Sequence, residues 1–221
     1  MNVDSNMART TALPLATYKT SPKQLNEYTQ YLAAGVGRVF FHQLHECTPK
    51  NGWTPQILSE CESPLADPWV PMCSFVWTEP MDTLVTRATG FAAEEFVMIA
   101  ARCLHLQPNE LVTSVIIFEA CLSKHPSLLK PHTFRTLALA CFCLAKHVCM
   151  DNDITSTHLS DALFPYFAGM CPKRLALAQE QILVILNWRI PLKKETYDTC
   201  ETYLKGVAFA VTGKQVANPQ E

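Results

Sequence analysis

Residues 137–145 read Leu-Ala-Leu-Ala-Cys-Phe-Cys-Leu-Ala and lie in the most apolar segment of the chain, 133–149. The segment predicts a helix whose apolar side chains point in every direction, and such a helix must be enclosed by other helices. The Asp151-Asn152-Asp153 stretch that follows is expected to end it. We therefore predict that 133–149 is the central helix of a helical domain.

Further helices are predicted on both sides of this segment. Ser21 offers an N-cap and Pro22 a first helical position, and apolar residues then recur at helical spacing to residue 45. Another helix begins at Pro108 and ends at His125-Pro126. The remaining predicted helices are 91–104, 155–167, which is weaker, 172–188 and 195–204. No stretch has the alternation typical of strands, so the predicted fold class is all-α.

The chain divides into four predicted parts. Residues 1–20 are polar and rich in threonine, which indicates a disordered tail. Residues 21–89 hold the first helix and an irregular extension, because 48–80 contains six prolines and three tryptophans. Residues 90–205 form the main helical domain, and 206–221 form a C-terminal tail.

The composition of the 221 residues is that of a folded domain, with 48% apolar and 17% charged residues and a net charge of −2. The longest basic groupings are pairs, which argues against nucleic acid as a partner. The first twenty residues lack the apolar core of a signal peptide, and the longest apolar run has nine residues, too few for a membrane span. We therefore expect a cytoplasmic or nuclear protein, in which most of the ten cysteines are small core residues.

The sequence contains no motif that predicts catalysis. It has no glycine-rich phosphate loop, no HExxH and no GxSxG. His42, His45 and Cys47 match no strong zinc spacing, and Asp151 and Asp153 lack the glycine and glutamate of a calcium loop. We expect neither an enzyme nor a metal or cofactor site.

Three motifs occur in an order that resembles a known family. They are Leu106-Gln-Pro-Asn-Glu-Leu-Val112, Arg135 eleven residues before Lys146, and Leu186-Asn-Trp-Arg-Ile190. Together they resemble the cyclin box, a five-helix bundle around a buried third helix, and the match covers about 90–205. The spacing is similar to that of the phosphate-regulatory cyclins and cyclin Y, whereas 150–164 resembles the neuronal activators of a cyclin-dependent kinase. The resemblance implies a cyclin-box bundle with an extra N-terminal helix and an irregular segment rich in proline and tryptophan.

The resemblance also implies a partner, a cyclin-dependent serine/threonine protein kinase whose C-helix this chain would hold inward. Lys146 would act as a polar clamp with Gln179 or with Glu180. Counting back from Trp188, Gln179 takes the place of the family's glutamate, and Glu180 is one residue away. The implied kinase-binding residues are Cys143, Lys146, His147, Gln179, Glu180 and Leu183. Lys146 should then be partly exposed, and removing its side chain should leave the fold intact.

The residues themselves leave two interpretations open. Lys146 ends an apolar helix, where the helix dipole favours a cation by about 0.3–1 kcal/mol without any partner. The helix 172–188 is apolar on two faces, with Leu177, Val184 and Trp188 opposite its main apolar stripe. Either another protein or another part of this chain could cover that second face. The alternative function is a scaffold or adaptor of the same fold that does not activate a kinase.

Overall fold

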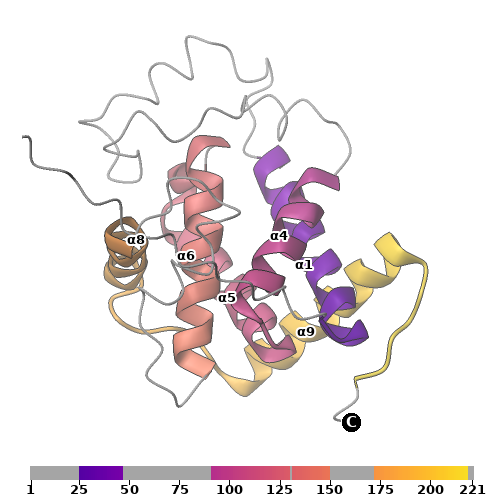
Figure 1. Cartoon of the computed structure of the whole chain (residues 1–221). Coiled ribbons are helices and arrows are strands. Elements are labelled where there is room, and N and C mark those ends of the chain that lie inside the picture. The colour runs from indigo at the N-terminus through magenta and orange to yellow at the C-terminus, as the bar shows by residue number, and fades with distance from the viewer. Residues whose placement is uncertain (1–24, 47–90, 130, 150–171, 219–221) are drawn as a thin grey trace, which may run out of the picture.

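The computed structural model describes residues 25–46, 91–129, 131–149 and 172–218, and the regular elements in this part of the chain are all helical (Figure 1). The all-α prediction is confirmed for these residues. The predicted tail 1–20, the segment 48–80 and the predicted helix 155–167 lie outside them. The elements are α1 (Glu27–Glu46), α4 (Phe91–Leu104), α5 (Pro108–Lys124), η1 (Pro126–Leu128), α6 (Pro131–Cys149), α8 (Pro172–Ile185) and α9 (Lys194–Thr212).

Helix α6 is enclosed as predicted, and α5 shares the centre of the bundle with it. Every residue of 137–145 is at most 5% exposed. The run 110–118 of α5 is also buried throughout, because α5 packs against α1, α6, α8 and α9. Figure 1 places α5 and α6 between α8 at one edge of the bundle and α1 and α9 at the other.

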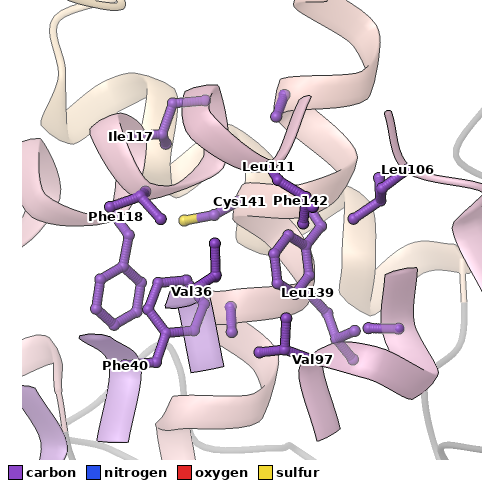
Figure 2. Packing of buried hydrophobic residues seen from close by; sticks show 14 of the residues in the cluster. Val36, Phe40, Val97, Leu106, Leu111, Ile117, Phe118, Leu139, Cys141 and Phe142 are labelled. Atoms are coloured by element: carbon purple, nitrogen blue, oxygen red, sulfur yellow. The ribbon is translucent and has the colours of Figure 1, made fainter. Parts of the chain in front are cut away.

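Aromatic rings join the helices across this core. Phe40 of α1 stacks on Phe118 of α5 with ring centroids 4.3 Å apart, and it lies 5.9 Å from Phe142 of α6. Phe134 of α6 touches both Phe40 and Phe96 of α4. Such ring pairs add about 0.5–1.5 kcal/mol each to the gain from burial. Figure 2 shows Phe40, Phe118 and Phe142 pointing into one apolar space.

Two glycines let α1 approach its neighbours closely. A Cβ added to Gly35 would lie 2.8 Å from the Leu204 carbonyl oxygen of α9, and one added to Gly37 would lie 2.5 Å from the Glu94 Cα of α4. The interface between α1 and α9 also contains a hydrogen bond, in which Tyr31 donates its hydroxyl to the Lys205 carbonyl at 2.6 Å. Glycine is a poor helix former, but at these two positions it allows α1 to pack closely against α4 and α9.

Helix α8 ends three residues before the predicted boundary at 188. Asn187 and Trp188 have φ values of 53° and 58°, in the left-handed region. The Trp188 N–H donates to the Leu183 carbonyl at 2.7 Å, and the Asn187 N–H donates to the Val184 carbonyl at 2.9 Å. These two bonds form the Schellman arrangement, in which asparagine is the usual substitute for glycine.

Helix α9 is longer than predicted. It continues past Leu204 to Thr212, where Gly213 caps it with φ 66°. Leu204 and Ala208 of α9 are buried, and both lie against Gly35 of α1. Tertiary packing thus extends a helix that the sequence pattern predicts only to residue 204.

The cysteines of the described residues are mainly core residues, as predicted. Those that are buried are Cys103, Cys121, Cys141, Cys143 and Cys200, whereas Cys149 is half-buried. Burial raises the pKa of Cys103 to about 11 and that of Cys121 to about 12, so both remain thiols at neutral pH. No described helix is both long enough and apolar enough to cross a membrane.

Replacing Leu139 with Asp should cost several kcal/mol of unfolding free energy, because the carboxylate would be buried without a partner. Urea unfolding followed by circular dichroism measures this loss. Leu177→Asp is the matched control, since Leu177 is 43% exposed on α8 and its replacement should change stability little. Equal stability of L139D and L177D would contradict the central position of α6.

Replacing Gly37 with Ala should destabilise the fold by about 1–3 kcal/mol, because the new methyl group must push α1 and α4 apart. Gly206→Ala is the opposite case within α9, where an added Cβ meets nothing within 4 Å. It should stabilise the protein by about 0.4–1 kcal/mol through a smaller loss of backbone entropy. Thermal unfolding of both variants tests the pair, and a stabilising G37A would show that α1 and α4 do not pack this closely.

Candidate functional site

The predicted clamp residue Lys146 lies in a buried ion pair at one end of the bundle. Helices α5 and α6 form an antiparallel hairpin, so the last turn of α6 lies beside the first turn of α5. Lys146 Nζ is 3.5 Å from Glu110 Oε1 and 3.5 Å from the His105 carbonyl oxygen. The Lys146 and Glu110 side chains are only 8% and 1% exposed.

Glu110 has a second role, because it caps the helix that carries it. The Gln107 backbone N–H donates to Glu110 Oε2 at 2.7 Å, which satisfies one of the free donors at the start of α5. Burial raises the pKa of Glu110, while the Gln107 N–H and the Lys146 ammonium act in the opposite direction. Each carboxylate oxygen is thus bound to a different donor, and Glu110 joins the start of α5 to the end of α6.

The expectation that Lys146 is partly exposed is therefore wrong. The residue is 7% exposed, and it reaches an acid of α5 rather than solvent. The hairpin geometry explains this, since an acid in the first turn of one helix faces the last turn of the next. Sequence reasoning missed Glu110, although its position three residues after the Gln107 N-cap and the short α5–α6 connection were both readable.

The two candidate partners of Lys146 lie on different sides of α8. Gln179 is buried, and its Nε2 donates to the Leu175 carbonyl of the same helix at 3.2 Å. Glu180 is exposed. Because α6 and α8 pack together, Gln179 lies on the helix face that also carries the buried Ala178 and Ile182, and Glu180 is left for solvent or a partner.

The other predicted contact residues also differ in accessibility. Cys143 is fully buried, which does not fit the surface contact with a kinase that the resemblance implies for it. His147 and Leu183 are half-buried, and Leu183 packs against the core cluster. Burial and the adjacent Lys146 charge lower the pKa of His147, which favours its neutral form at neutral pH.

The outer side of α8 carries large apolar side chains in solvent. Leu177 is 43% exposed, Val184 56% and Trp188 66%. Leu177 and Val184 are two helical turns apart and share one stripe, and Trp188 follows them in the strained turn. We call these three residues the outer row of α8. The inner stripe, which includes Leu175, is buried against the bundle, so the two predicted apolar faces are confirmed within the helix. Trp188, which was predicted to share the second face, lies beyond the end of α8.

The described residues contain no group of three or more His, Cys, Asp or Glu side chains that could hold a metal ion. His42 Nδ1 lies 3.3 Å from Glu46 Oε1 on the same helix. Cys47, Asp151 and Asp153 lie outside the described residues. Comparison of this chain with protein-family models, curated proteins and solved structures finds no match.

The expectation that the Lys146 side chain can be removed without affecting the fold assumed an exposed lysine. With Lys146 buried beside Glu110, replacing it with Met should lower the unfolding free energy at neutral pH by about 3–5 kcal/mol, because the Glu110 carboxylate stays buried without its cation. A group whose folded-state pKa is raised stabilises the fold below its ordinary pKa, and this contribution is lost as the pH rises through the folded-state value. Without Lys146 the pKa of Glu110 should rise further. The loss of unfolding free energy in K146M should therefore be smaller when urea unfolding is repeated near pH 4.5, the ordinary pKa of a glutamate carboxyl.

The double variant Lys146→Met with Glu110→Gln is the control for this pair. It removes both charges, and it should recover most of the stability that K146M loses at neutral pH. A buried pair would be contradicted if the double variant lost as much stability as K146M and Glu110→Gln lose together. It would also be contradicted if the stability loss of K146M did not change with pH.

Proposed function

We propose that this chain is a regulatory subunit that docks on a cyclin-dependent serine/threonine protein kinase and activates it. The resemblance of its helical motifs to the cyclin box supports this partner, and the all-helical bundle is compatible with it. The observation that carries the proposal is the outer row of α8, an exposed apolar stripe on a helix at the edge of the bundle.

The outer row has the properties of a protein-binding surface. Burying a side chain such as Leu or Val contributes about 1.5–3 kcal/mol of favourable free energy. Because the outer row is in solvent in the isolated chain, this free energy becomes available when a partner covers the row. Trp188 is exposed and has φ 58°, a strained value for a bulky residue, and such strain concentrates at functional sites. Tryptophan is also among the residues most enriched at binding hot spots.

The buried polar residues have a positioning role in this proposal. Lys146 and Glu110 tie the end of α6 to the start of α5, and Gln179 lies on the side of α8 that faces the bundle. The packing of the inner stripe of α8 on α6 leaves the outer row free to face a partner. Glu180 is the exposed polar group of the predicted set and would make the hydrogen bonds to the kinase.

One observation favours the second candidate, a scaffold of this fold that binds a partner without activating a kinase. The lysine that the resemblance assigns to the kinase is engaged with Glu110 inside the bundle. A chain that binds through apolar contacts alone would not need that lysine at its surface. The two functions differ in whether the rate of phosphorylation changes on binding.

The test mixes the purified chain with purified cyclin-dependent kinase catalytic subunits, one at a time, and measures binding and the phosphorylation of a peptide substrate. We expect one of these subunits to bind and its phosphorylation rate to rise at least tenfold. Val184→Asp should weaken this binding by about 2–5 kcal/mol, because an unpaired charge would be buried in the interface.

Phe209→Asp is the control, since Phe209 is 53% exposed on α9, at the other edge of the bundle. It should bind and activate like the unchanged chain. Binding without a change in rate would select the scaffold function. If no catalytic subunit binds, or if V184D binds as tightly as F209D, the proposal is wrong.

A further inference from the structure

A lysine at the end of α5 reaches the end of α8, where the turn of Asn187 and Trp188 begins. Lys124 is the last residue of α5, and its Nζ donates to the Ile185 carbonyl at 3.0 Å. The two residues are 61 positions apart in the chain, so this bond joins two separate helices. Because Ile185 is the last residue of α8, the bond lies at the boundary between the helix and the turn that follows it.

The bond completes the capping of α8. The last carbonyls of a helix have no partner within the helix itself. In α8 the backbone of the following turn supplies donors to the Leu183 and Val184 carbonyls, through the Schellman bonds described above. The Ile185 carbonyl comes next, and Lys124 supplies its donor from α5. A cation is thereby placed at the negative end of the α8 dipole, where it is favoured.

The turn needs such support because it is strained. Asn187 and Trp188 have φ values of 53° and 58°. Asparagine adopts the left-handed region readily, whereas a bulky residue does so at a cost in free energy. Such a conformation persists only where the surrounding structure holds it. The Trp188 side chain is 66% exposed, so its own packing contributes little, and the support comes from the hydrogen bonds at the base of the turn.

The position of Lys124 separates the turn from the rest of α8. Lys124 is exposed, and the inner stripe of α8 packs mainly on α6 rather than on α5. Removal of the Lys124 side chain should therefore weaken the turn while α8 stays in its place on the bundle.

We propose that Lys124 is a positioning residue for the partner-binding surface, because it holds the strained turn that presents Trp188. The inference rests on the proposed function in one respect, which is that Trp188 contacts a partner. The hold of Lys124 on the turn is a property of the isolated chain. Without this bond the turn opens more often, and Trp188 leaves the orientation in which it follows the outer row of α8.

NMR of the full isolated chain tests the hold on the turn. The NOE between the amide and α protons of one residue is strong at positive φ, so it reports the left-handed conformation of Trp188. Lys124→Met removes the donor, and this NOE should weaken. Exchange of the Trp188 amide with solvent should also become about threefold to tenfold faster, the range expected for the loss of one hydrogen bond.

Two further variants are the controls for this measurement. Lys124→Arg keeps a charged donor and should restore both the NOE and the slow exchange. Lys214→Met removes an exposed lysine beyond the end of α9 and should change neither. An unchanged Trp188 in K124M would overturn the proposal. So would a K124R variant that behaves like K124M, or an equal change in K214M.

Binding to a cyclin-dependent kinase catalytic subunit tests whether Lys124 acts through Trp188. K124M should weaken this binding about threefold, because fewer molecules hold the competent turn. In a chain that carries Trp188→Ala, K124M should cause no further loss. An equal loss in both backgrounds would overturn the proposal, since Lys124 would then act without Trp188. If no subunit binds the unchanged chain, the proposed function is wrong, and the NOE of Trp188 still decides whether Lys124 holds the turn.

Discussion

The apolar run 137–145 of α6 has to be buried on every side, and the arrangement of the other helices follows from this requirement. Helix α5 covers it along one side, and the rings of Phe40 and Phe134 connect α1 and α4 to the same core. Helix α8 covers it from another side. Because α8 lies at the edge of the bundle, only its inner stripe is used, and its outer row remains in solvent. The surface proposed for a partner is thus a consequence of how the core is closed.

The ion pair of Lys146 and Glu110 shows how a polar group is accommodated in such a core. A buried lysine is costly unless it has a partner, and Glu110 supplies one while also capping α5. Replacing such pairs by apolar residues is often neutral or stabilising, so their value lies more in fixing geometry than in adding stability. Here the pair aligns the end of α6 with the start of α5. We propose that the lysine stabilises the bundle on which α8 packs and does not itself touch the partner.

Most of the fold could be predicted from the sequence where proline and hydrophobic periodicity mark an element clearly. The predicted start of α1 at Pro22 is wrong, because Leu25 and Asn26 lie outside the helix and the Asn26 side chain accepts the Thr29 N–H at its start. Pro108 and Pro126 bracket α5, and 137–145 is sufficient to predict the burial of α6. The end of α8 was missed because Asn187 acts as a left-handed cap, a role that glycine signals more clearly. The full length of α9 depends on packing against Gly35, which no local pattern reveals. The site was predicted only in part, because exposure depends on tertiary contacts: Lys146 and Cys143 are buried, whereas the outer row of α8 was readable from its spacing.

Hydrogen–deuterium exchange of the chain, alone and with an activated cyclin-dependent kinase catalytic subunit, tests the central claim most directly. That claim is that α8 binds the bundle with one face and a partner with the other. We predict slower exchange on kinase binding in the peptides that cover 175–190, with the peptides of α1 and α9 unchanged. Slower exchange confined to α1, α4 or α9, with α8 unaffected, would contradict it.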